Sequence, residues 1–533
     1  MGQSPQETNV QASFGGAPAP PPALGLGQWF TERARRSPGR KALSFEGGRW
    51  TYGELLEEID RLAALLQQGG VRAGTRVAYL GLNHPSFYVG LFACAKLGAI
   101  FVPLNFRLTG PELAYIIEDA GAHTLLVGAE HLAVIDGVRE QLHCRHYWCA
   151  QGESSDPERW PPLAPALAAT APLRGRGAAP AADDVALIMY TSGTTGRPKG
   201  AMLTHGNFWS NHMAELYTMD VMADDVLLVF APIFHIGALN VLNLTTFLKG
   251  GHVVLHRSFD AGRALRDIAA EKVSILFSVP AMLLFISQHA DFASADLSSL
   301  RMIMCGGAPC PEPLLRLYGG RGIDINQGYG LTETTAMASA LTSEFAAAKL
   351  GSVGQPPLLT ELRLVDPAGQ VVEEPLARGE ICVRGQCVTR GYWNNPEATR
   401  AAIDAQGWFR TGDVGYFDAE GFWYVCDRVK DMVITGGENV YPAEVESVLY
   451  GHPAIAEVAV VGAPDEKWGE MVVAVVALKP GQALTLEQLQ AFAGERLARY
   501  KLPRRLQVVD ALPRNPTGKI LKYRLREGMR EVG

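Results

Sequence analysis

The 533-residue sequence has few cysteines, and their spacing builds neither a disulfide framework nor a zinc site. Eight cysteines occur, and no two of them form a Cys-x-x-Cys pair. The densest group of metal-ligand types lacks a second ligand pair at a suitable spacing; its members are His143, Cys144, His146 and Cys149. Free thiols are typical of a reducing compartment, so the composition predicts a cytoplasmic protein.

We also expect no N-terminal targeting signal. Residues 1–24 contain neither a basic start nor an apolar run, which argues against a secretory signal peptide. Gln6 stands where N-myristoylation requires Ser or Thr. Because the segment is rich in Ala, Pro and Gly, we expect residues 1–24 to form a disordered tail.

Long apolar runs are rare, and a net charge of −7 gives no general attraction to nucleic acid. Residues 87–104 form the one candidate span, but Lys96, Gly98 and Pro103 favour a buried helix followed by a strand. We therefore expect no integral membrane segment and no nucleic-acid partner. A basic cluster within residues 496–505 leaves peripheral membrane contact open, although a solvated helix face explains it more simply.

The length exceeds what one ordinary core supports, so we expect two or more domains. Helix and strand patterns alternate from about residue 25 to 350, which predicts an α/β body of parallel sheets flanked by helices. Short β-branched runs predict a β-rich part at about 350–426. The predicted domains are 25–428 and a small α+β module at 429–533, with a helix at 442–450, strands at 457–462 and 471–478, and a helix at about 485–500.

Residues 190–200 are dense in hydrogen-bond donors. After an apolar run that predicts a strand, the chain reads Tyr-Thr-Ser-Gly-Thr-Thr-Gly-Arg-Pro-Lys-Gly. Glycines let backbone N–H groups approach a ligand closely, and the hydroxyls and cations add further donors. The pattern differs from a P-loop, which carries Gly-Lys-Ser/Thr at the start of a helix. It predicts a polyphosphate site; the alternative is a solvent-exposed linker.

Four further motifs follow in order. Residues 327–334 read Gln-Gly-Tyr-Gly-Leu-Thr-Glu-Thr, 410–413 Arg-Thr-Gly-Asp, 427–431 Asp-Arg-Val-Lys-Asp, and 513–519 Pro-Arg-Asn-Pro-Thr-Gly-Lys. Together the five motifs resemble those of the acyl-adenylate-forming superfamily, the AMP-binding acyl-CoA synthetases. The resemblance covers about residues 25–526 and is closest to bacterial fatty-acyl-CoA synthetases.

The resemblance implies an AMP-forming acid–thiol ligase. Such an enzyme joins a small carboxylic acid to ATP with release of diphosphate, then passes the acyl group from the acyl-adenylate to coenzyme A. It implies ATP, Mg²⁺ and CoA as ligands and leaves the oligomeric state open. Because two anions meet during adenylation, cations and N–H dipoles at the site are expected to supply most of the rate.

The resemblance also assigns the nucleotide ligands by position. Glu333 is a hard oxygen ligand for Mg²⁺ together with Thr195, although a carboxylate there also suits a helix N-terminus. Asp413 accepts from the ribose hydroxyls, and Tyr329 offers a face to adenine, unless its ring is core packing. The remaining predicted ligands are Thr191, Ser192, Gly193, Thr194, Gly196, Lys199, Gly306, Gly307, Ala308, Gln327, Gly328, Gly330 and Thr332.

Three predictions concern the C-terminal part. Arg428 and Lys430 mark the hinge about which the family rotates its small domain between half-reactions. Gly436 and Gly437 are predicted to line the path of the pantetheine arm. Lys519 is predicted to hold the acid carboxylate and the α-phosphate, with Lys199, Glu333 and His235 as the other catalytic candidates.

The acid is the least defined substrate. The predicted pocket segments, 234–244, 304–307 and 329–337, are apolar, which favours a medium- or long-chain fatty acid. An aromatic acid is the alternative. Phe234 and His235 are predicted to border this pocket, although Phe234 fits core packing nearly as well. Loading of a carrier protein, a luciferase-like oxidation and an inactive scaffold remain open as other functions.

Overall fold

The computed structural model describes residues 25–530, except for 176, 178, 192–196, 429–430, 436–437, 466–467 and 515–519. The predicted tail and several predicted ligands therefore lie outside the described residues. These ligands are Ser192, Gly193, Thr194, Thr195, Gly196, Lys430, Gly436, Gly437 and Lys519.

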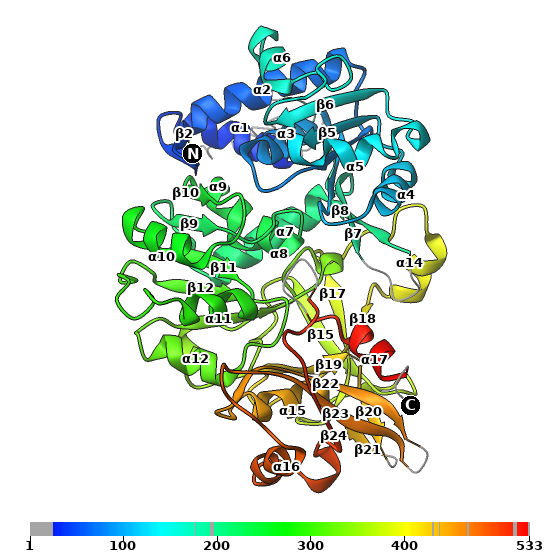
Figure 1. Ribbon diagram of the computed structural model, residues 1–533. Coiled ribbons are helices and arrows are strands. Elements are labelled where there is room, and N and C mark those ends of the chain that lie inside the picture. The colour runs from blue at the N-terminus through cyan, green and yellow to red at the C-terminus, as the bar shows by residue number, and fades with distance from the viewer. Residues whose placement is uncertain are drawn as a thin grey trace, which may run out of the picture.

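Two largely parallel sheets form the α/β body, as the alternation of helices and strands predicts (Figure 1). In spatial order the first contains β6 (His146–Gln151), β5 (Thr124–Gly128), β3 (Arg76–Leu80), β4 (Ile100–Leu104), β7 (Val185–Thr191) and the antiparallel β8 (Lys199–Thr204). The second contains β14 (Ser339–Ala340), β13 (Ile325–Tyr329), β12 (Met302–Cys305), β11 (Ile275–Ser278), β9 (Val226–Val229), β10 (His252–Leu255), β1 (Lys41–Phe45) and β2 (Gly48–Thr51).

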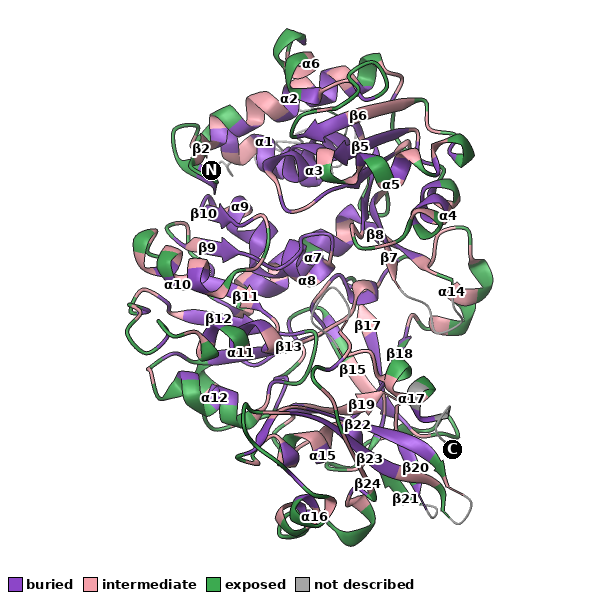
Figure 2. Ribbon diagram, in the orientation of Figure 1, coloured by how far each residue is buried: buried purple, intermediate pink, exposed green. Residues whose placement is uncertain are grey.

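Helices bury their apolar sides against these sheets (Figure 2). One large core is shared by both sheets, and a second core lies on the other face of the first sheet. A capping box begins α2, because Thr51 Oγ1 accepts from Glu54 N at 3.2 Å and Glu54 accepts from Thr51 N at 2.8 Å. The longer helices of the body are α1 (Leu26–Arg36), α2 (Tyr52–Gln68), α3 (Pro85–Leu97), α4 (Gly110–Ala120), α7 (His205–Thr218), α10 (Ala261–Ala270), α11 (Pro280–Gln288) and α12 (Glu312–Gly319).

The predicted β-rich part is an antiparallel sheet. In spatial order it contains β16 (Val371–Val372), β15 (Thr360–Val365), β17 (Gly379–Gly385), β18 (Phe409–Phe417) and β19 (Trp423–Arg428). Below it in Figure 1 lies the C-terminal sheet, with β21 (Glu438–Val440), β20 (Val433–Thr435), β23 (Gly469–Leu478), β22 (Ile455–Asp465) and β24 (Arg505–Val508).

The C-terminal helices are α15 (Pro442–Leu449), α16 (Leu486–Gly494) and α17 (Lys522–Arg530). The predicted helix at about 485–500 is therefore wrong in its length, since α16 ends at Gly494. Glycine is a poor helix former, and past it the chain turns so that Leu497 contributes to the small core.

The apolar run at 87–104 is a buried helix and a buried strand, as predicted. All residues of α3 and β4 are buried, and the Lys96 ammonium pairs with the buried carboxylate of Asp60. Among the described residues, no helix is both long enough and apolar enough to cross a membrane.

Candidate active site

Strands β7 and β8 place the two ends of the predicted phosphate segment side by side. Thr191 is the last residue of β7 and stands opposite Lys199, the first of β8. The segment between them, 192–196, lies outside the described residues. Thr191 and Lys199 therefore lie next to each other at the carboxyl end of β7.

Glu333 lies in a short 3₁₀ turn (Thr332–Thr334) close to Thr191 at the end of β7. Its side chain is 7% exposed, and its Oε1 accepts hydrogen bonds from the hydroxyls of Tyr392 at 2.9 Å and Thr191 at 3.4 Å. In the described part of the chain both of these bonds end on Oε1, which leaves Oε2 as a hard oxygen ligand. A carboxylate in this setting fits a divalent cation such as Mg²⁺.

Tyr392 is a residue of the site that the sequence reasoning missed. It lies between β17 and β18, and besides donating to Glu333 it offers its ring to Lys199, whose Nζ lies 5.4 Å from the ring centroid. Burial, and then the Glu333 carboxylate, raise the pKa of Tyr392, so the hydroxyl stays a donor. The local sequence signal was a single glycine, Gly391, which directly precedes Tyr392 and has φ +129°.

Asp413 and Tyr329 meet on the other side of the site. The Tyr329 hydroxyl donates to Asp413 Oδ2 at 2.7 Å, and Arg428 Nε lies 3.2 Å from Asp413 Oδ1. Strand register brings the last two together, because Asp413 on β18 pairs with Arg428 at the end of β19. Asp413 is 5% exposed. Burial and the neighbouring carboxylate raise the pKa of Tyr329 well above its usual value.

The predicted glycines pack backbone against backbone where β12 and β13 end. A Cβ on Gly306 would lie 3.1 Å from the carbonyl oxygen of Gly328, and one on Gly330 would lie 1.8 Å from that of Ala336. Gly307 has φ +80°, a conformation that favours glycine. Ala308 follows on the exposed side of the turn. These contacts give a flat wall beside Tyr329.

Gln327 is turned away from this wall. Its Nε2 donates to the carbonyl of Ser352 at 3.1 Å, and its Oε1 accepts from the backbone N–H of Cys310 at 3.2 Å. The side chain thus fixes the loop after Ala308 from behind. Thr332 opens the 3₁₀ turn that carries Glu333 and is partly exposed.

His235 lies at the start of α8 (Ile236–Leu239), with its ring 4.1 Å from that of Phe234. Its Nε2 is buried and has no hydrogen-bond partner within the described residues. Burial, with a smaller effect from Arg107, lowers the pKa of His235 to about 3. The imidazole is therefore neutral at physiological pH. Phe234 packs edge-on against Phe106 at 5.1 Å, in line with the core interpretation of that residue.

Phe277 on β11 lies between two of the predicted pocket segments, 234–244 and 304–307. A Cβ on Gly237 would lie 2.9 Å from its ring, and one on Gly306 would lie 3.5 Å from it. A small internal cavity, scarcely larger than a water molecule, lies beside this ring. Its lining is apolar except for Asn243; the residues are Leu227, Leu228, Val229, Ala231, Ala238, Val241, Asn243 and Phe277.

A charged cluster follows the predicted hinge. Lys522 on α17 lies 2.8 Å from Glu446 and 3.8 Å from Asp427, and Asp427 Oδ2 accepts from Ala443 N at 2.9 Å. Arg526 on α17 pairs with Asp431. The helix that follows the predicted lysine loop is thus tied to the residues on either side of the hinge.

Comparison with known proteins identifies this arrangement. The model of the AMP-binding enzyme family matches residues 30–393, and that of the AMP-binding enzyme C-terminal domain matches 444–519. The chain belongs to the AMP-binding enzyme family. The predicted superfamily is confirmed, as is the prediction of an AMP-forming acid–thiol ligase.

The relatives of this chain include ligases named for aromatic acids and ligases named for fatty acids. Feruloyl-CoA synthase from Amycolatopsis sp is 45% identical over 94% of this chain and 98% of its own. Long-chain-fatty-acid–CoA ligase from Mycobacterium tuberculosis is 40% identical, with 94% and 98% covered. o-Succinylbenzoate CoA synthetase from Bacillus subtilis has been solved with ATP and a magnesium ion, at TM-score 0.82, 34% identity, and coverage of 94% and 99%. The coarser class, an acyl- or aryl-CoA ligase, is therefore established, and the acid is open.

Proposed function

We propose that this AMP-binding enzyme activates a compact aromatic carboxylic acid with ATP and transfers the aroyl group to CoA. The acid lies, in this proposal, against the wall formed by Gly306, Phe277 and Gly237. The apolar sequence pattern favoured a fatty acid, with an aromatic acid as the alternative. The proposal adopts the aromatic acid.

The observation that carries the proposal is the polar closure behind the cavity. Asn243 Nδ2 donates to the Tyr88 hydroxyl at 2.8 Å and to the carbonyl of Ala238 at 2.9 Å, and these groups are buried. A long alkyl chain continuing in this direction would have to separate them. Leaving a buried polar group unpaired costs about 1–3 kcal/mol, so a short, flat acid fits this end of the pocket better.

The relatives add support of a weaker kind. The feruloyl-CoA synthase is 45% identical to this chain, against 40% for the long-chain-fatty-acid–CoA ligase. The second relative keeps a fatty acid as the other candidate, and the apolar lining of the cavity is compatible with it.

In the proposed reaction the chain's own residues hold the nucleotide in place. Asp413 accepts from the ribose, Tyr329 and the glycine wall hold adenine, and Lys199 neutralises phosphate charge. Glu333 would hold Mg²⁺, which when bound supplies positive charge to the phosphates. His235, which is neutral, borders the acid without adding charge. Lys519 and the loop 436–437 keep their predicted roles in adenylation and thiol transfer.

The test is CoA-dependent AMP release across ferulate, benzoate, octanoate and palmitate at matched concentrations. We expect an aromatic acid to give the highest kcat/KM. If octanoate or palmitate leads instead, the ligase chemistry stands and the proposed acid class is wrong. AMP release that does not depend on CoA would contradict the proposed acceptor.

A further inference from the structure

Glu215 is a buried carboxyl on α7 that the reaction described above does not use. It is 0% exposed. No basic side chain forms an ion pair with it within the described residues; its partners are uncharged donors. Burial raises the pKa of Glu215 to about 7. Burying a carboxyl group costs folding free energy unless hydrogen bonds compensate for the lost water.

The first partner of Glu215 is a strained turn in the proposed acid pocket. Between α8 and α9 (Thr245–Lys249) the chain has Val241 at φ −62°, ψ 116° and Leu242 at φ +64°, ψ −32°. These are close to the central angles of a type II turn, whose third position usually holds glycine. The turn's own hydrogen bond does not use the N–H of that position, and here Leu242 N donates to Glu215 Oε2 at 3.2 Å.

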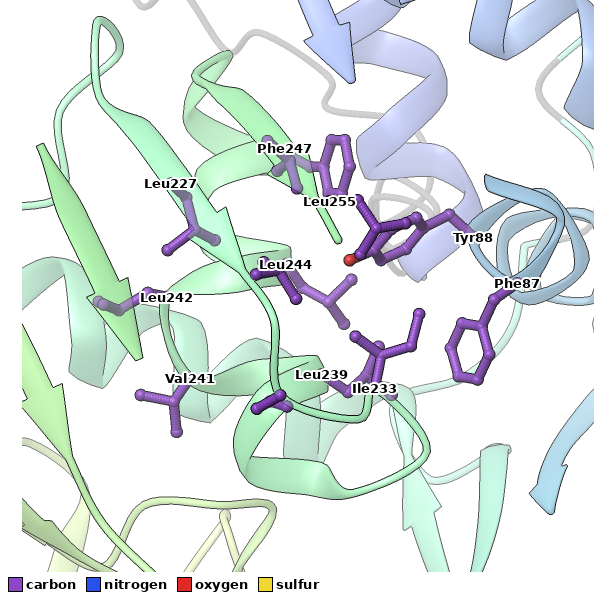
Figure 3. Packing of buried hydrophobic residues seen from close by; sticks show 14 of the residues in the cluster. Phe87, Tyr88, Leu227, Ile233, Leu239, Val241, Leu242, Leu244, Phe247 and Leu255 are labelled. Carbon is purple, nitrogen blue, oxygen red and sulfur yellow. The ribbon is translucent and has the colours of Figure 1, made fainter. Parts of the chain in front are cut away.

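Glu215 Oε2 also binds the first residue of the next helix, α9. The Thr245 hydroxyl donates to Glu215 Oε2 at 2.5 Å, where α9 begins. Figure 3 shows the side chains of this segment: Leu239 and Leu244 lie on the side of Ile233, Tyr88 and Phe247, whereas Val241 and Leu242 extend to the other side. Val241 is also one of the residues that line the small cavity. Glu215 therefore holds the backbone that places one wall of the proposed acid pocket.

The other oxygen reaches the nucleotide side through Asn211. Asn211 Nδ2 donates to Glu215 Oε1 at 2.9 Å, and Asn211 Oδ1 accepts from Met337 N at 3.2 Å. Just before Met337 the chain contains two more left-handed residues, Thr335 at φ +54° and Ala336 at φ +93°. This is the segment that leads out of the 3₁₀ turn carrying Glu333.

A second connection runs parallel to the first. Asn240, in the pocket segment, donates from Nδ2 to the carbonyl of Thr335 at 2.7 Å, and its Oδ1 lies 2.8 Å from His212 Nε2 on α7. Leu242, Thr335 and Ala336, which all have positive φ, thus lie in segments that hydrogen bonds tie to side chains of α7 or to Asn240. Strained backbone of this kind persists only where its surroundings hold it, and it gathers at functional sites.

We propose that Glu215 is a positioning residue that sets the distance and orientation of the acid pocket relative to the ATP site, and so determines which acids are adenylated. The proposal rests on the proposed location of the acid pocket. It does not depend on which acid is preferred, because any acid must meet the α-phosphate at the same point.

Glu215→Gln is the informative change. The amide group would set a donor against either Leu242 N–H or the Asn211 amide. If Asn211 turned over to relieve this, its own N–H₂ would face the N–H of Met337. The substitution therefore shifts one segment relative to the other while removing no volume.

The experiment measures acid-dependent ATP–pyrophosphate exchange for Glu215→Gln with the four-acid panel. We expect the ratio of kcat/KM between the best and worst acid to fall by about 100-fold, with the KM for ATP changed less than about twofold. Thr245→Val, which removes one donor at constant shape, is expected to give the same trend at about fivefold. If Glu215→Gln does not fold, Thr245→Val decides.

The matched control is Asp60→Asn, another buried carboxyl, which pairs with Lys96 and contacts neither segment. We expect it to lower Tm and to leave the kcat/KM ratio between the best and worst acid unchanged. Folded Glu215→Gln or Thr245→Val with the wild-type ratio would overturn the proposal, and so would an equal fall of the ratio in Asp60→Asn. The wild-type ranking itself tests only the proposed acid class, so the two failures are distinguishable.

Discussion

The two carboxylates of the proposed nucleotide site, Asp413 and Glu333, have different neighbours. Asp413 lies between a hydroxyl and a guanidinium, which suits an acceptor for two ribose hydroxyls. Glu333 receives two hydroxyls on one oxygen, and Lys199 lies close by over the Tyr392 ring. A cation ligand needs the full negative charge, so the charge of Glu333 matters more than its shape.

Glu333→Gln keeps the hydrogen-bonding shape and removes the charge. We expect ATP–pyrophosphate exchange to fall at least about 100-fold, since electrostatic groups at such sites contribute that much. The Mg²⁺ concentration for half-maximal rate is expected to rise. Glu361→Gln, an exposed carboxylate paired with Arg384, serves as the control. Wild-type exchange in Glu333→Gln would rule out the metal role.

Gly237 is a second residue whose role is local and testable. In Gly237→Ala the new methyl carbon would lie 2.9 Å from the Phe277 ring, so the ring must move toward the proposed acid site. Helix propensity favours alanine by about 1 kcal/mol, and we expect Tm to stay within a few degrees. We expect kcat/KM for aromatic acids to drop about 10-fold. An unchanged value for every acid would place the acid elsewhere.

At the scale of elements, the sequence predicted well wherever the signal is local. The buried pair of α3 and β4 and the β-rich sheet follow from adjacent residues. Thr191, Lys199 and Glu333 share one place, as the motifs imply. Tyr392 and Phe277 were missed because their contacts are distant in the chain; Tyr392 and Glu333 are 59 residues apart. The strained turn at Leu242 was missed because leucine gives no turn signal.

The attachment of α17 also belongs to this scale. Glu446→Gln removes the partner of Lys522 while Asp427 remains; the Lys522 and Glu446 side chains are 15% and 20% exposed. Breaking a buried pair costs several kcal/mol, and we expect about 2 kcal/mol here because the pair is partly exposed. Limited proteolysis should show earlier cleavage after about residue 430, with the body intact. If the variant is cleaved after residue 430 no earlier than the wild-type chain, the charged cluster does not hold α17.

Burial lowers the pKa of several histidines in the molecule. The pKa of the buried His205, His212 and His252 falls to about 4 in each case, that of His235 falls to about 3, and that of the buried His256 is lowered as well. The unfolded chain binds protons near pH 6.5 and the folded chain does not. Their contribution to stability is therefore present above pH 6.5 and is lost as the pH falls toward 4.

Between pH 7 and 5.5 each of these groups should cost the folded state about 1 kcal/mol. We expect Tm to be flat from pH 8 to 7 and to fall below pH 6.5. His252→Gln should reduce the fall by the share of one such group, about 1 kcal/mol, whereas the exposed His143→Gln should leave it unchanged. A Tm that stays constant to pH 5.5 would contradict the neutral state of these imidazoles.

The central claim concerns the molecule as one catalyst of two half-reactions. The most direct test is a single-turnover incubation with ATP, Mg²⁺ and ferulate, followed by CoA, with the products identified by mass spectrometry. The account predicts that feruloyl-AMP accumulates before CoA is added and is converted to feruloyl-CoA and AMP afterwards. Absence of any aroyl-adenylate, or an adenylate that persists in the presence of CoA, would contradict it.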